Sequence, residues 1–216
     1  MIKHIVIVTD IFGLCIGLEQ LVQDLAQAGK NQTDADQTAG SRLSITVIDP
    51  FQQQRQCFSN EQQAYAAYTE QCGHDNYAST VARAIVQPAD LAIGFSAGAS
   101  ALWRALSTPA AANIKQAMLF YPGQIHQYLK LTPDIPASII FGASEPHFNV
   151  DAMLQLLSQK PSVSACKTMY QHGFMNQPSA AFSEEAYQHY LNVIKERSGG
   201  LLNTPTNTAA TTAETR

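Results

Sequence analysis

The sequence predicts a single α/β domain built on a doubly wound, mostly parallel sheet of six strands. Three observations carry this prediction. Short apolar runs alternate along the chain with longer segments whose apolar residues recur at helical spacing. The short runs are apolar throughout, as in parallel strands that helices cover on both faces. The chain has 216 residues, of which 45% are hydrophobic and 14% charged, which suits one globular domain with a substantial core.

The elements follow one another in a regular order. The opening run IKHIVIV (2–8) is predicted to be a buried strand, and residues 14–29 an amphipathic helix that ends at Gly29. A second strand is expected at 43–49, and helical sequence rich in Gln and Ala fills most of 60–87. Four further strands are predicted at 90–95, 114–121, 137–143 and 163–170, with helices at 97–107, 149–158 and 180–197. This alternation implies right-handed crossovers in one sheet.

The domain is expected to span residues 1–198, followed by a disordered tail rich in Thr and Ala over 199–216. The net charge of -4 and the lack of a basic stripe argue against a nucleic-acid partner. No segment reaches membrane-spanning length, and Asp10 interrupts a first apolar run too short for a signal peptide. A cytoplasmic protein with no membrane partner is therefore expected, its oligomeric state left open. Four cysteines without a C-x-x-C pair are expected to be reduced thiols: Cys15, Cys57, Cys72 and Cys166.

Three strand ends carry the side chains that acyl-transfer chemistry uses, and ligands bind beyond such ends in open α/β sheets. The segment GFSAG fits G-x-S-x-G between a buried strand and a helix that opens with small residues, which makes Ser96 a candidate nucleophile. His172, after the last strand, is the candidate base, and Glu145 the candidate acid that orients it. Asp151, in the first turn of the next helix, is the alternative acid. The order Ser, Glu, His is that of the α/β-hydrolases.

Each of these residues also has a purely structural interpretation. Ser96 would then mark a tight turn between strand and helix, His172 would cap or pack in its loop, and Glu145 would be a solvated loop acid. The alternative function is a non-catalytic small-molecule-binding protein on the same fold, because a fold does not fix a function.

Acyl transfer also needs backbone N–H groups for the oxyanion, one of them from the residue after the nucleophile. That residue is Ala97, and the loop after the first strand offers the amide of Ile11 as the second donor. Asp10 beside it is unusual, because a carboxylate near an oxyanion is unfavourable, and it serves either as a turn or capping residue or in the function itself. Asp10 and Phe12 are expected to line or modulate the substrate pocket.

No metal or cofactor is expected. The segment GLCIG lacks both the Lys-Ser/Thr ending of a phosphate-binding loop and the third glycine of a dinucleotide turn. The other histidines show no metal-ligand spacing with cysteines or carboxylates: His4, His74, His126, His147 and His189.

Over residues 2 to about 197 the chain resembles the dienelactone hydrolase family of α/β-hydrolases. Four segments carry the resemblance: VTDIFG after the first strand, GFSAG at the serine, FGASEP at the acid and HGF at the histidine. The resemblance implies Ser96 as nucleophile, Glu145 as acid and His172 as base, with Ile11 and Ala97 as oxyanion donors. Asp10 would stand where the family has a glutamate beside the nucleophile.

The sequence also departs from the family pattern. The founding enzymes have cysteine where this chain has Ser96, and typically aspartate where it has Glu145. The arginines that bind a substrate carboxylate in dienelactone hydrolase have no clear counterpart. Arg55 is a loose candidate, and Asn176 stands just after the histidine motif.

These departures favour a general serine esterase over an enzyme that acts on the family's own dienelactone substrate. The resemblance starts at a core strand, so the family's first two strands are expected to be missing, and residues 121–136 are too short for a large lid. The expected function is hydrolysis of a small carboxylic ester or lactone through an acyl-enzyme. Two alternatives to this function are the non-catalytic binding protein and an enzyme that transfers the acyl group to an acceptor other than water.

Overall fold

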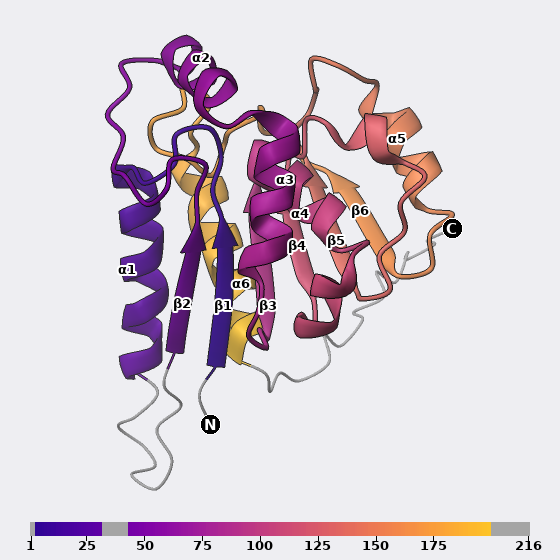
Figure 1. The fold of residues 1–216 in the computed structure, drawn as a ribbon, viewed down its shortest axis with the longest axis horizontal. Helices are drawn as coiled ribbons and strands as arrows, with labels where there is room; N and C mark the ends of the chain where they lie inside the picture. The colour runs from indigo at the N-terminus through magenta and orange to yellow at the C-terminus, as the bar shows by residue number, and fades with distance from the viewer. Residues whose placement is uncertain (1–2, 32–42, 200–216) are drawn as a thin grey trace, which may run out of the picture.

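A computed structural model describes residues 3–31 and 43–199 (Figure 1). Its strands are β1 (Lys3–Val8), β2 (Leu43–Ile48), β3 (Leu91–Phe95), β4 (Ala117–Phe120), β5 (Ala137–Phe141) and β6 (Val163–Lys167). They form one sheet in the order β2-β1-β3-β4-β5-β6, and every neighbouring pair is parallel. The predicted doubly wound, mostly parallel sheet of six strands is confirmed, and its strand pairs are all parallel.

Helices cover both faces of the sheet. The α-helices are α1 (Ile16–Asn31), α2 (Glu61–Gln71), α3 (Gly73–Ala84), α4 (Ala97–Ala105), α5 (Val150–Leu157) and α6 (Glu184–Gly199). Helices α1 and α6 lie on one face with Ile5 and Ile7 of β1, whereas α3, α4 and α5 pack on the other face with Val6 and Val8. Successive side chains of β1 therefore contribute in alternation to two apolar cores, one on each side of the sheet.

Some boundaries differ from the sequence prediction. The helical stretch at 60–87 is two helices, because Gly73, the first residue of α3, adopts a φ of 73° and this left-handed conformation breaks the helix. The last helix begins at Glu184, so that residues 180–183 belong to the loop before it. The tail predicted to be disordered lies, from residue 200 onward, outside the described residues.

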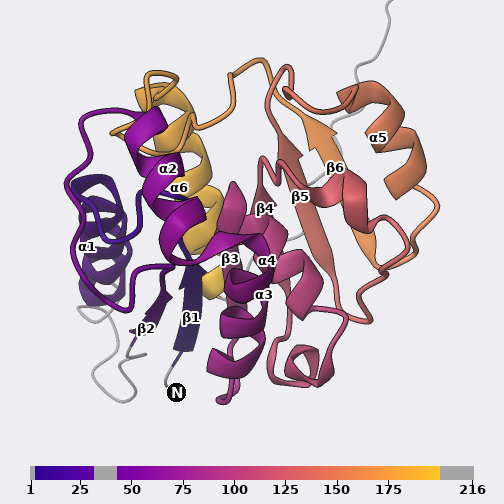
Figure 2. The same ribbon diagram turned by 45° about the horizontal axis from the view of Figure 1, so that its top comes forward.

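The parallel arrangement brings all strand carboxyl ends to one edge of the molecule. Helix α2 lies over this edge near β1 and β2, and Figure 2 turns the edge forward, with α2 on one side and α5 on the other. The connection between β4 and β5 holds one short 3-10 helix, η2 (Ile125–Tyr128), as expected for a fold without a large lid. Within the described residues, no helix has the length and apolar character needed to cross a membrane.

Candidate active site

Ser96 occupies a strained turn between β3 and α4. Its φ of 48° and ψ of -112° lie where residues other than glycine are rarely found. The two glycines of the motif make this turn possible. A Cβ at Gly94 would lie 2.6 Å from Ala99 Cα, and one at Gly98 would lie 2.1 Å from the Thr9 carbonyl oxygen. The motif therefore has a steric reason, since both glycines let the helix approach the sheet.

Ser96, His172 and Glu145 form a chain of hydrogen bonds. Ser96 Oγ lies 2.9 Å from His172 Nε2, and His172 Nδ1 lies 2.6 Å from Glu145 Oε2. A carboxylate only accepts hydrogen bonds, so Nδ1 carries the proton and donates it to Glu145. In the neutral imidazole Nε2 is then an acceptor, and the Ser96 hydroxyl donates to it. This is the protonation pattern that a general base requires.

Glu145, the acid in this chain of hydrogen bonds, is held by a backbone amide of its own loop. Glu145 Oε1 accepts a hydrogen bond of 3.2 Å from the Gly142 amide, and the Glu145 side chain is 0% exposed. The alternative acid, Asp151, is elsewhere. Its Oδ1 lies 2.6 Å from Lys167 Nζ, and its side chain is 67% exposed. The structure thus brings Glu145 to His172 and pairs Asp151 with a surface lysine.

The tyrosine that follows β4 supports His172 from the side. The ring centroids of Tyr121 and His172 are 4.9 Å apart, and Tyr121 itself has a strained φ of 40°. Its amide donates 2.7 Å to the Ile140 carbonyl, which fixes the strained residue to β5. Tyr121 was not among the residues predicted for the site from the sequence. The available signal was its place directly after an apolar strand, at the edge where ligands bind.

A pocket of about 160 Å³ opens beside Ser96 and His172. Ile11 and Ala97, the two expected oxyanion donors, both line it. The rest of the wall comes from the loops and helices at the carboxyl edge: Tyr65, His74, Ser100, Gly123, Gln124, Pro146 and His147. A hydroxyl, a base and two candidate amide donors therefore surround one small cavity, which is what acyl transfer needs.

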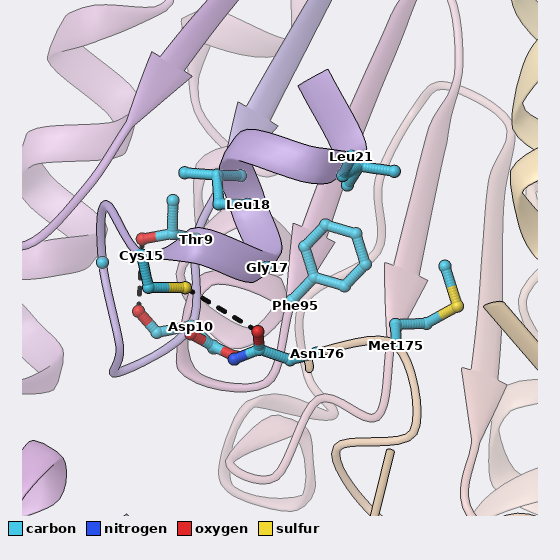
Figure 3. Close-up of a pocket in the computed structure, with 10 residues that line it drawn as sticks. Thr9, Asp10, Cys15, Gly17, Leu18, Leu21, Phe95, Met175 and Asn176 are labelled. Atoms are coloured by element: carbon cyan, nitrogen blue, oxygen red, sulfur yellow. Dashed lines mark hydrogen bonds between the residues drawn. The ribbon is translucent and has the colours of Figure 1, made fainter. Parts of the chain in front are cut away.

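Asp10 lines a different cavity, of about 20 Å³, shown in Figure 3. Its Oδ1 accepts from the Phe12 amide at 2.9 Å, and its Oδ2 accepts from Asn176 Nδ2 at 2.7 Å. Cys15 Sγ in turn donates to Asn176 Oδ1 at 3.7 Å. Burial raises the pKa of Asp10 to about 6 and that of Cys15 to about 11. Asp10 is thus a buried, hydrogen-bonded carboxyl outside the wall of the Ser96 pocket.

Phe12 and Arg55 line a third cavity, of about 240 Å³. Arg55 Nη2 lies 3.0 Å from Glu19 Oε2, so this arginine already has an anionic neighbour. Neither residue lines the pocket at Ser96. Among residues 3–31 and 43–199, no cluster of three or more His, Cys, Asp or Glu side chains could hold a metal ion, and all four cysteines are free.

Comparison with known proteins agrees with this architecture. No family model matches the sequence. One curated relative, an uncharacterized protein of Bacillus subtilis (strain 168), is 29% identical over 116 residues, which is 52% of this chain. The match spans only about half of that relative, 55% of its length.

Solved structures are similar over most of the chain. A dienelactone hydrolase-like promiscuous phosphotriesterase from metagenomic libraries has a TM-score of 0.62 at 15% identity, covering 91% of this chain and 85% of its own. A cold-adapted esterase from an Arctic intertidal metagenomic library has a TM-score of 0.58 at 15% identity, covering 91% and 83%. A thioesterase domain from the curacin biosynthetic pathway has a TM-score of 0.55 at 12% identity, covering 89% and 90%. The chain therefore has the α/β-hydrolase fold, in the form also found in dienelactone hydrolase-like proteins.

Proposed function

We propose that this protein is a serine hydrolase of the dienelactone hydrolase type that cleaves a small carboxylic ester or lactone. The observation that carries the proposal is the continuous chain from Ser96 Oγ through His172 to the buried Glu145 carboxylate, with distances of 2.9 and 2.6 Å. The strained turn at Ser96 adds support, because backbone strain at an exposed edge is characteristic of functional residues.

In the proposed reaction, Ser96 Oγ attacks the ester carbonyl while His172 Nε2 takes the hydroxyl proton. Glu145 holds the imidazole in position and stabilises the imidazolium that forms. The bond from carbon to the leaving alkoxide then breaks, and the proton on Nε2 passes to the alkoxide oxygen. Water, deprotonated by His172, attacks the acyl-enzyme and releases the acid and free Ser96.

The developing oxyanion would be bound by the amides of Ala97 and Ile11, which line the same pocket as Ser96. The Ala97 amide is at the N-terminus of α4, where the first N–H groups of a helix have no partner within the helix. The volume of about 160 Å³ favours a small acyl or alkoxy group. No cofactor takes part in these steps.

The experiment is intact-mass analysis after exposure to a fluorophosphonate, followed by peptide mapping. We expect one adduct, on Ser96, and its loss in His172→Ala. A matched control is His126→Ala, since the His126 ring contacts the Gly123 carbonyl at 3.2 Å and His126 does not line the pocket at Ser96. Folded wild-type protein that forms no adduct and turns over no activated ester would instead support the binding protein.

A further inference from the structure

The pocket at Ser96 is lined by a half-exposed tyrosine, Tyr65 on α2. Among residues 3–31 and 43–199, the large apolar and aromatic side chains that are exposed are those of Ile16, Tyr65, Val86, Leu156 and Met169. Tyr65 is the one of these five that lines the pocket, and 50% of its surface is accessible. It is thus an aromatic side chain that a substrate bound at Ser96 can still cover.

Two neighbouring rings hold the ring of Tyr65. Its centroid lies 6.4 Å from that of Tyr68 and 6.4 Å from that of His74, with the planes tilted by 38° and 50°. Tyr68 is completely buried, and its hydroxyl lies 3.1 Å from His74 Nδ1. His74 lines the pocket as well, so the Tyr65 ring lies beside another ring of the same wall. A ring held in this way loses little freedom when a ligand binds.

The helix that carries Tyr65 is fixed to the loop of the candidate base. Ser179, in the loop that follows His172, donates a hydrogen bond of 2.9 Å from its Oγ to Glu61 Oε1 in the first turn of α2. The side chain of Asn60 caps the same helix end by accepting from the Gln63 amide at 2.9 Å. Figure 2 shows α2 over the edge where the strands end. The position of Tyr65 relative to the catalytic edge is therefore built into the fold.

The pocket has the size and the chemistry to bind an uncharged ring. None of the described residues that line it is an Asp, Glu, Lys or Arg, and burial lowers the pKa of His74, so that its imidazole is neutral at pH 7. Its volume of about 160 Å³ is close to the volume of about 150 Å³ of an apolar cavity that binds benzene. A charged group would find no partner of opposite charge in this wall.

We infer that Tyr65 makes the enzyme selective for small, uncharged esters that carry an aromatic ring in their acyl or alkoxy group, by packing its own ring against that of the substrate. This inference rests on the proposed hydrolase function. Two aromatic rings attract each other in offset or edge-to-face arrangements by more than the area that they bury. A saturated ring with the same number of carbons buries a similar area and lacks this attraction.

Pairs of esters that differ only in the saturation of one ring test the inference. On the acyl side, methyl phenylacetate is compared with methyl cyclohexylacetate. On the alkoxy side, benzyl acetate is compared with cyclohexylmethyl acetate. The measured quantity is the ratio of kcat/KM for the aromatic ester to that for the saturated ester, in the wild type and in Tyr65→Leu. Comparing the two proteins cancels the different intrinsic reactivities of the esters.

We expect this ratio to be about 3- to 10-fold higher in the wild type than in Tyr65→Leu, in at least one of the two pairs, because leucine retains an apolar side chain and has no ring. Tyr65→Phe keeps the ring and should keep the preference. Gln62→Leu is the matched control, since Gln62 is exposed on the same helix and does not line the pocket, and it should keep the preference as well.

Equal ratios in the wild type and Tyr65→Leu for both pairs would overturn the inference and leave the hydrolase function intact. So would a wild-type protein that is labelled at Ser96 by the fluorophosphonate and hydrolyses neither aromatic ester. Absence of both labelling and ester turnover would instead remove the proposed function and the specificity together. Thermal unfolding of each variant identifies a loss that arises from misfolding.

Discussion

Asn176 Nδ2 donates a hydrogen bond of 2.7 Å to Asp10 Oδ2, across 166 positions of sequence. Asp10 directly precedes Ile11 in the loop after β1, and Asn176 lies four residues after His172. The bond therefore joins the loop with the expected oxyanion amide to the loop with the candidate base. Both residues are buried, and Figure 3 shows their side chains meeting beside Cys15.

The raised pKa of Asp10 predicts a pH-dependent stability difference between the wild type and Asp10→Asn. The folded pKa is about 6 and the ordinary value 3.8, so the folded state binds the proton more tightly. The stability contribution of Asp10 is therefore complete below about pH 4 and is lost as the pH rises toward about 6. Asparagine does not ionise, so the free energy of unfolding of the variant relative to the wild type should rise by about 1–3 kcal/mol from pH 4 to pH 8.

Urea unfolding of both proteins at several pH values measures this difference. Asp10→Asn also lowers the free energy of unfolding directly, because an amide cannot accept from both Phe12 and Asn176 as the carboxylate does. This loss is the same at every pH, so it can be distinguished from the pH-dependent part that arises from ionisation of Asp10. If the difference in unfolding free energy between the two proteins did not change between pH 4 and pH 8, the raised pKa of the buried Asp10 would be wrong.

The strained backbone at Ser96 predicts that substitutions there separate stability from activity. Ser96→Gly should be more stable than Ser96→Ala by about 1–2 kcal/mol, since only glycine adopts a φ of 48° with this ψ at little cost. Both variants should lose about 10³–10⁶ in kcat, because neither has a nucleophile. Thermal unfolding and ester hydrolysis together check the two parts. Ester turnover within a few-fold of the wild type would end the assignment of Ser96.

Most of the architecture was predictable from local pattern. Strands buried on both faces are apolar throughout, and the helices between them have their own periodicity, so the six-stranded parallel sheet could be read from sequence. The break at Gly73 was missed. A glycine inside a run of helix-forming residues does not by itself indicate that its φ is positive.

The candidate site was likewise predictable in part from the sequence. Ser96, Glu145 and His172 follow three different strands, and parallel topology brings such ends to one edge, so their proximity could be expected. The contacts of Tyr68 with His74 and of Asp10 with Asn176 depend on side-chain directions and on how loops pack, and no periodicity encodes these. Phe12 shows that proximity in sequence does not predict which cavity a side chain lines. It neighbours an expected oxyanion residue in sequence yet lines another cavity.

The close approach of α4 to β1 predicts unequal effects for two glycine substitutions. A Cβ at Gly98 would lie 2.1 Å from the Thr9 carbonyl oxygen and 2.5 Å from that of Val8, both of them backbone atoms that cannot turn away. Gly98→Ala should therefore cost more than about 2 kcal/mol of unfolding free energy. Gly73→Ala has nothing within 4 Å and only the strain of its φ of 73°, so it should cost about 1–2 kcal/mol.

Denaturant unfolding of the two variants provides the comparison, with Gly73→Ala as the matched control for the general effect of adding a methyl group. The order of the two costs is the result that matters. If Gly73→Ala were the more destabilised protein, the tight contact of α4 with the end of β1 would be wrong.

The two candidate acids can be separated by one isosteric substitution at each. In Glu145→Gln the amide can donate to His172 Nδ1, which favours the tautomer with its proton on Nε2, so the imidazole can no longer accept the Ser96 proton. We expect kcat to fall by about 10²–10⁴, with a parallel loss in the rate of fluorophosphonate labelling. Asp151→Asn removes only a charge that faces Lys167 at the surface, so its kcat should stay within about twofold of the wild type, since exposed ion pairs contribute little. A large loss in Asp151→Asn together with an active Glu145→Gln would reverse the assignment of the acid.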